Sequence, residues 1–138
     1  MDIVTLQAPL CTGLFAAALM IMQMVLMGMV IKQRLKSQVL IGDGDGDGDL
    51  LQTVRVHGNF VENAPIFLVG LALIEVLVGS NSWVLVMGSI FFVGRLLHAL
   101  GMSMTTGPSI LRAAGALASL MVTLVAACYL GYTVLQSM

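Results

Sequence analysis

The stretch from Leu10 to Ile31 is apolar and contains no charged residue, and it constrains the fold more than any other feature. A helix of roughly 20 apolar residues crosses the hydrocarbon core of a bilayer, where a backbone must satisfy its own hydrogen bonds. Three further apolar segments follow along the chain. The sequence therefore predicts an all-α membrane protein, a four-transmembrane-helix bundle that forms a single domain over residues 1–138. The expected helices cover about residues 8–35, 50–79, 83–102 and 108–135.

The composition excludes an ordinary soluble domain. The chain is 59% hydrophobic, has a mean hydropathy of +1.02 and is only 9% charged, whereas soluble domains carry about a quarter charged residues. The net charge of −1 and the absence of a basic patch give no indication of a nucleic-acid partner. Cys11 and Cys128 have neither zinc-ligand nor redox-motif spacing. We expect both to be small core residues, and we predict no metal site.

The basic residues predict the orientation in the membrane. Lys32, Arg34, Lys36 and Arg55 flank the first connection between helices, and Arg112 flanks the third. The second connection and both termini contain no Lys or Arg. Connections rich in Lys and Arg remain in the cytoplasm, so we expect both termini to lie outside.

The first connection contains alternating glycines and aspartates over residues 42–49. Asp43, Asp45 and Asp47 match the first half of a calcium-binding loop. Such a loop requires a bidentate Glu at its twelfth position, which here is Val54. We therefore interpret the run as a flexible, solvated linker whose Asp49 caps the second helix.

A polar face is expected on the second helix. Arg55, Asn59 and Glu62 are spaced i, i+4 and i+7, so at about 100° per residue they share one face. A charge at the bilayer centre costs about 3 kcal/mol and normally faces a partner or a cavity. Two readings stay open: a site for a zwitterionic ligand, or an internal ladder of salt bridges.

The third and fourth helices carry further charged or titratable groups. Arg95 is a fixed cation that can pair with Glu62 or hold a carboxylate. His98 is either a hydrogen-bonded helix residue or a proton shuttle. Arg112 is either a membrane anchor or an anion-stabilising group at the mouth of a cavity. All of these groups fall in the half of the bundle expected to face the cytoplasm, and this convergence predicts a binding site there.

Two motifs resemble a known family. The sequence R-x-H-G-N-x-x-E-N-x-P over residues 55–65, and V-G-R-L-L-H over residues 93–98, resemble segments of the membrane-associated proteins in eicosanoid and glutathione metabolism, the MAPEG family. The chain is most similar to the small bacterial branch. This resemblance implies a bacterial inner-membrane homotrimer surrounded by lipid, with glutathione bound between neighbouring protomers and a hydrophobic small molecule as second substrate.

The resemblance also implies roles for single residues. A cation beside a thiol of pKa near 8.5 raises its thiolate fraction, and the thiolate then attacks a hydrophobic electrophile or a lipid hydroperoxide. The implied activity is that of a glutathione transferase or peroxidase. Arg112 is the expected thiolate-stabilising, catalytic residue, and the expected glutathione-binding residues are Arg55, Asn59, Glu62, Arg95 and His98.

The chain departs from the eukaryotic synthases of that family, which have tyrosines at the site on helices three and four. The helix-three positions are His98 and Met102, and residues 113–120 contain no Tyr. Tyr129 and Tyr132 lie further along the chain. The alternative function is therefore a non-catalytic lipid- or glutathione-binding scaffold of the same fold.

A small four-helix multidrug exporter is a third class of protein to consider. Such exporters depend on a membrane-embedded acid in the first helix. The apolar body of the first helix here has only Gln23 as a notable polar group, which argues against an exporter.

Overall fold

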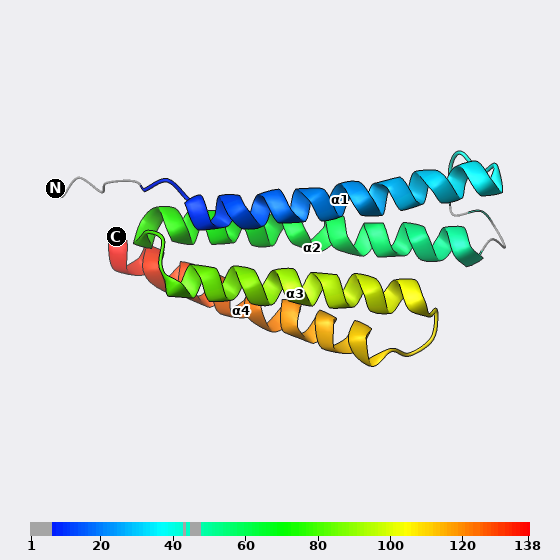
Figure 1. Cartoon of the computed structure of the whole chain (residues 1–138). Coiled ribbons are helices and arrows are strands. Elements are labelled where there is room, and N and C mark those ends of the chain that lie inside the picture. Colours follow the sequence, from blue (N-terminus) through cyan, green and yellow to red (C-terminus); the bar gives the residue numbers. More distant parts are fainter. Residues whose placement is uncertain (1–6, 43, 45–47) are drawn as a thin grey trace.

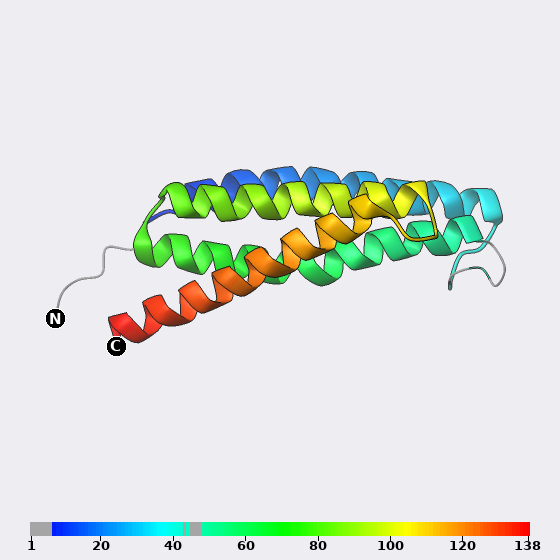
Figure 2. The ribbon, with the colours of Figure 1, turned by 90° about the horizontal axis from the view of Figure 1, so that it is seen from below.

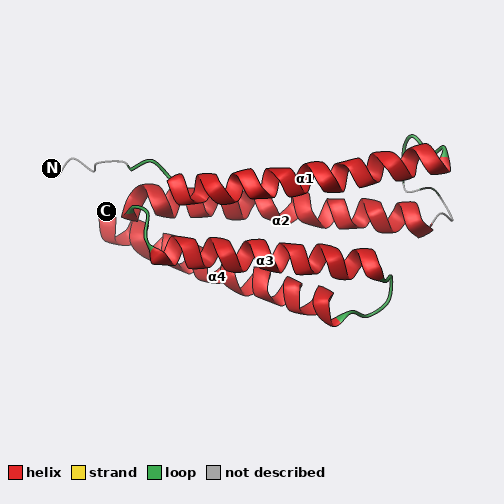
Figure 3. Cartoon of the chain, viewed as in Figure 1, coloured by secondary structure: helices red, strands yellow, loops and turns green. Residues whose placement is uncertain are grey.

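The computed structural model describes residues 7–42, 44 and 48–138, and every regular element among them is a helix (Figure 3). The all-α prediction is confirmed: four helices are long and apolar enough to cross a membrane. Their ends differ from the expected ones by one or two residues. The helices are α1 (Leu10–Ser37), α2 (Gly48–Val78), α3 (Ser82–Met104) and α4 (Ile110–Ser137).

The helices form an elongated up-and-down bundle (Figure 1). The α1–α2 and α3–α4 connections lie at one end, which we call the basic end because Lys32, Arg34, Lys36, Arg55 and Arg112 lie in its half of the helices. The start of α1, the end of α4 and the α2–α3 turn lie at the opposite end. Seen from below, α4 crosses the bundle obliquely (Figure 2). It starts beside the end of α3 and diverges from it.

Local signals explain where the helices begin and end. Gly79 has a φ of 79°, which favours glycine, and it directly follows the last residue of α2. The side chain of Asn81 accepts hydrogen bonds from the backbone N–H groups of Trp83 (2.9 Å) and Val84 (3.2 Å) and so caps α3. Pro65 lies inside α2, which continues through it.

Aromatic stacking joins α2 and α3 in the core. The rings of Phe67 and Phe91 are parallel within 5°, with centroids 3.8 Å apart, and Phe60 is buried in the same cluster. Phe92 packs against that cluster from its edge. The structure therefore places all four rings in or against the core. Cys128, by contrast, is exposed, so the expectation that it is a core residue was wrong.

Glycines allow α3 and α4 to touch at the basic end. A Cβ atom on Gly94 would lie 2.7 Å from Oγ of Ser119 and 3.1 Å from the carbonyl oxygen of Gly115. A Cβ on Gly101 would collide with the backbone of Arg112. Small residues at such positions let helix backbones approach closely in membranes. This contact holds the first turn of α4 directly against α3.

At the opposite end, a buried carboxylate caps α1. Glu75 on α2 is fully buried and accepts hydrogen bonds from the backbone N–H groups of Cys11 (2.8 Å) and Thr12 (2.7 Å). The Ser80 hydroxyl donates to the same carboxylate. Pro9, at the cap position, supplies no side-chain hydrogen bond. Glu75 therefore satisfies backbone donors that the start of a helix leaves free.

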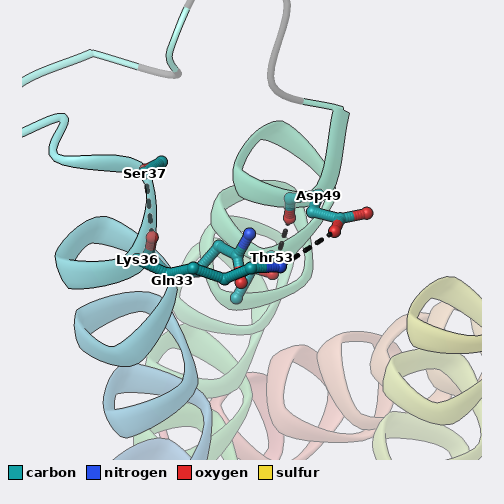
Figure 4. A network of polar contacts seen from close by, with 5 residues as sticks. All are labelled: Gln33, Lys36, Ser37, Asp49 and Thr53. Carbon is teal, nitrogen blue, oxygen red and sulfur yellow. Dashed lines mark hydrogen bonds and ion pairs between the residues drawn. The ribbon is translucent and has the colours of Figure 1, made fainter.

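Polar contacts link α1 and α2 beside their connection (Figure 4). The amino group of Lys36 lies 3.7 Å from a carboxylate oxygen of Asp49, and the Thr53 hydroxyl donates to the Asp49 carbonyl at 2.8 Å. Because α2 begins at Gly48, Asp49 belongs to its first turn rather than preceding it. Its charge there complements the helix dipole. The aspartates of the calcium-loop reading, Asp43, Asp45 and Asp47, lie outside the described residues.

Candidate functional site

A cavity of about 300 Å³ opens at the basic end between α2, α3 and α4. It brings together four residues that the sequence singled out: Arg55 and Asn59 from α2, His98 from α3 and Arg112 from α4. The complete lining consists of Gly48, Leu51, Gln52, Arg55, Asn59, His98, Met102, Thr105, Thr106 and Arg112.

Arg95 does not line this cavity but contacts one of the lining residues, Asn59. Arg95 is only 3% exposed, and its Nη2 donates a hydrogen bond to Oδ1 of Asn59. A guanidinium has donors and no acceptor, so this contact also orients the Asn59 amide. Its carbonyl oxygen faces Arg95, and its NH₂ group is left as the donor. Arg95 therefore acts on the cavity through Asn59 and does not pair with Glu62.

His98 connects α3 to the start of α4. Its Nδ1 lies 2.9 Å from the backbone carbonyl oxygen of Arg112, and the side chain is 6% exposed. Gly101 and Gly115 lie at the same helix contact and allow this short distance. The ring lines the cavity, so His98 is both a hydrogen-bonded helix residue and part of the candidate site.

Two guanidinium groups give the cavity its charge. Arg55 and Arg112 are both exposed lining residues, on α2 and α4 respectively. Arg112 belongs to the first turn of α4, which Ser109 caps with a 3.4 Å hydrogen bond from the Arg112 N–H. The start of a helix also favours an anion. The site is therefore electropositive and suited to carboxylates and to a thiolate.

Glu62 is the predicted site residue that the cavity does not include. It shares a helix face with Arg55 and Asn59, but it lies further along α2 and is exposed. An exposed carboxylate within a membrane-spanning helix needs a partner. Within one protomer, the described residues place no cation beside it.

Gln52 also lines the cavity, and its helical spacing from Arg55 could have predicted this. Gln52 precedes Arg55 by three positions and so lies on the same face. Its side-chain Nε2 donates to the carbonyl of Met102 at 2.6 Å, which joins α2 to the end of α3 at the cavity. Thr105 and Thr106 line the cavity from the loop, and no helical period indicates a loop residue.

The remaining polar residues lie elsewhere. His57 faces away from the cavity, with its Nε2 3.0 Å from Nε2 of Gln23 on α1. Tyr129 lines a separate cavity of about 330 Å³ with Trp83, Met87 and Val125. The four residues of this separate cavity lie in the first half of α3 and the second half of α4, away from the basic end. Neither tyrosine of the chain lines the cavity with Arg55.

A second and larger cavity adjoins the first. It has a volume of about 770 Å³ and is lined by the loop residues 106–109 and the first turns of α4. His98, Thr106 and Arg112 line both cavities. The two cavities therefore share part of their walls.

Comparisons with known proteins show which family the chain belongs to. The sequence profile of the MAPEG family matches residues 12–132. The inner membrane protein YecN of Escherichia coli strain K12, and YecN of E. coli O6:H1, are each 34% identical to the chain over 73 residues. That region is 52% of this chain and 54% of each relative, so the alignment spans about half the length of these proteins. The profile match covers nearly the whole bundle, and the chain belongs to the MAPEG family.

Proposed function

We propose that the chain is a glutathione-dependent transferase or peroxidase of the bacterial inner membrane, working as a homotrimer on hydrophobic electrophiles or lipid hydroperoxides. The observation that carries the proposal is the cavity at the basic end, where Arg55, Asn59, His98 and Arg112 meet. Membership of the MAPEG family and the similarity to an inner membrane protein support it.

The chemistry of the lining suits glutathione, which has two carboxylates, an ammonium group, two amides and a thiol. In this proposal Arg55 binds a carboxylate, and Asn59, oriented by Arg95, donates to another acceptor group of the ligand. His98 contacts the ligand beside Arg112. The Arg112 guanidinium stabilises the thiolate, which is the nucleophilic form of a thiol.

Glu62 is the reason to propose a trimer with the ligand between protomers. It is exposed on the face of α2 that carries Arg55, and a neighbouring protomer covering this face would remove it from lipid. The ammonium group of glutathione is then its partner. The positive-inside rule places the basic end, and with it the cavity, towards the cytoplasm, and both termini outside.

Binding of glutathione to the purified chain tests the proposal. Titration calorimetry is expected to show binding, and Arg55→Ala should weaken it about tenfold or more, since hydrogen bonds to charged groups contribute about 1.5–3 kcal/mol. Arg34→Ala is the matched control, because Arg34 bonds to the Val39 carbonyl away from the cavity (3.3 Å). Absence of glutathione binding both in several detergents and in lipid would contradict the proposed function.

A non-catalytic lipid- or glutathione-binding scaffold is the second candidate. The observation that favours it is that the cavity lining contains no tyrosine, whereas Tyr129 lines a cavity elsewhere. This candidate predicts glutathione binding without conjugation of standard electrophiles and without reduction of hydroperoxides. Turnover with any of these substrates, abolished by Arg112→Ala, would exclude it.

A further inference from the structure

The backbone carbonyl of Arg112 determines the tautomer of His98. Nδ1 of the ring lies 2.9 Å from this oxygen, and a carbonyl oxygen can only accept a hydrogen bond. Nδ1 therefore carries the proton. In the neutral imidazole the other nitrogen, Nε2, then has a free lone pair and is an acceptor.

Nε2 of His98 is buried and has no hydrogen-bond partner among the described residues, and the same holds for Nε of Arg95, one turn earlier on α3. Buried polar groups almost always have a partner, and each exception calls for an explanation, of which a catalytic role is one. One of these orphans is an acceptor and the other is an N–H donor. Of the two, only His98 lines the cavity, and its Nε2 acceptor can be satisfied there by a ligand group that donates, such as a thiol or a hydroxyl.

The charges around the ring restrict what that group can be. The cations Arg95 and Arg112 flank His98 on α3 and α4. Among the described residues, no acid lines either of the two cavities that share the ring. An isolated imidazolium beside two guanidinium groups is unfavourable. It becomes acceptable when an anion forms next to it in the same step.

We propose that His98 is the general base of the site and takes the thiol proton of glutathione at Nε2. The S–H bond breaks, an N–H bond forms at Nε2, and the products are a thiolate and an imidazolium, so the total charge in the cavity does not change. Arg112 stabilises the thiolate. This inference rests on the proposed function, and it adds the fate of the proton to it.

The same proton completes the reaction. The thiolate attacks an electrophilic carbon, the new S–C bond forms, and the bond to the leaving group breaks. The leaving group departs with its electron pair and takes the proton from the imidazolium. The larger cavity, which shares His98 and Arg112 with the first, is the space from which the electrophile can reach both groups.

A proton count during binding tests the inference on the purified full chain in lipid. Glutathione is titrated in two buffers with different heats of ionisation, while the ultraviolet absorbance of the thiolate is recorded. The expected result is a thiolate signal with no net release of protons to the buffer. Thiolate formation with one proton released for each ligand would overturn the role of His98, and so would binding without thiolate. Absence of binding would instead overturn the proposed function.

A matched pair of variants gives a second readout. In His98→Asn the new amide can still donate to the Arg112 carbonyl but supplies no base, whereas His57→Asn changes the other histidine of the chain, which bonds to Gln23. We expect His98→Asn to bind glutathione and to lose the thiolate signal and about 10²–10⁴-fold in kcat. His57→Asn should keep both. An unchanged thiolate signal in His98→Asn would contradict the proposal.

Nitrogen NMR measures the tautomer without any ligand or turnover. With only two histidines in the chain, ¹⁵N-labelled histidine gives two sets of ring signals, and His57→Asn assigns them. His98 is expected to carry its proton on Nδ1 in the free protein and on both nitrogens once glutathione is bound. A free protein with the proton on Nε2 would contradict the geometry on which the base role depends.

Discussion

Nη2 of Arg95 donates a hydrogen bond to Oδ1 of Asn59, and this contact joins α3 to α2 behind the cavity. The guanidinium is almost fully buried and charged, so the amide oxygen is its stabilising partner within the bundle. Asn59 in turn lines the cavity. One hydrogen bond thus couples the stability of the α2–α3 pair to the shape of the candidate site.

Asn59→Ala removes that partner and leaves a buried cationic donor unsatisfied. We expect the free energy of unfolding in detergent to fall by about 1–3 kcal/mol and glutathione binding to weaken. Asn63→Ala is the control: Asn63 is exposed and its side chain bonds only to the backbone carbonyl of Asn59 (2.7 Å). Equal effects of the two substitutions on stability and binding would contradict the role of Asn59 as the partner of Arg95.

Two glutamates on α2 are expected to have opposite phenotypes. Glu75→Ala leaves the backbone N–H groups of Cys11 and Thr12 without their acceptor, so unfolding should become easier by about 2–4 kcal/mol. Glutathione affinity should not change, because Glu75 lies at the far end from the cavity. Glu62→Ala should weaken glutathione binding and leave the stability of the protomer unchanged. Thermal unfolding and calorimetry on both variants separate the two roles.

Gly101→Ala introduces a methyl group that collides with the backbone of Arg112. Overpacking of this kind costs about 1–3 kcal/mol, and displacement of Arg112 should also lower glutathione affinity. Gly131→Ala on α4 provides the comparison, since a Cβ there meets nothing within 4 Å and alanine favours a helix by about 1 kcal/mol. A Gly101→Ala protein as stable as Gly131→Ala would show that the two helices are not in tight contact.

The proposed orientation can be measured in cells. A phosphatase that folds only outside the cytoplasm should be active when it is fused after Met138 and inactive when it is fused after Lys36. The reason is the excess of Lys and Arg at the basic end. The reverse pattern would place the cavity outside and would invert the proposed topology.

Much of the fold followed from the sequence, because lipid leaves a helix few alternatives. An uncharged run such as Leu10–Ile31 is long enough to cross the membrane, and the helix ends were predicted to within one or two residues. The capping of α3 by Asn81 and of α4 by Ser109 was not predicted. The tight α3–α4 contact was not foreseen. Glycines are common in membrane helices, and nothing local distinguishes Gly101, which touches a backbone, from Gly131, which touches nothing.

The candidate site was predicted only in part, because local sequence patterns do not show which residues of different helices meet. Helical periodicity correctly placed Arg55 and Asn59 on one face, but it does not say how far along that face the cavity extends, and Glu62 lies beyond it. Glu75 shows the same limit nearer the other end of α2. Its partners on α1 are more than sixty residues away in the chain, and no local pattern identifies such a partner.

The oblique course of α4 divides that helix into two parts with different tolerance to change. Near its start, Gly115 and the backbone of Arg112 leave no room against α3, so substitutions in this part are expected to disturb the candidate site. Further along, where α4 has diverged from α3 (Figure 2), Val125 and Tyr129 border open space. Substitutions in that second part are therefore expected to reshape the cavity beside Tyr129 and to leave the geometry of the candidate site unchanged.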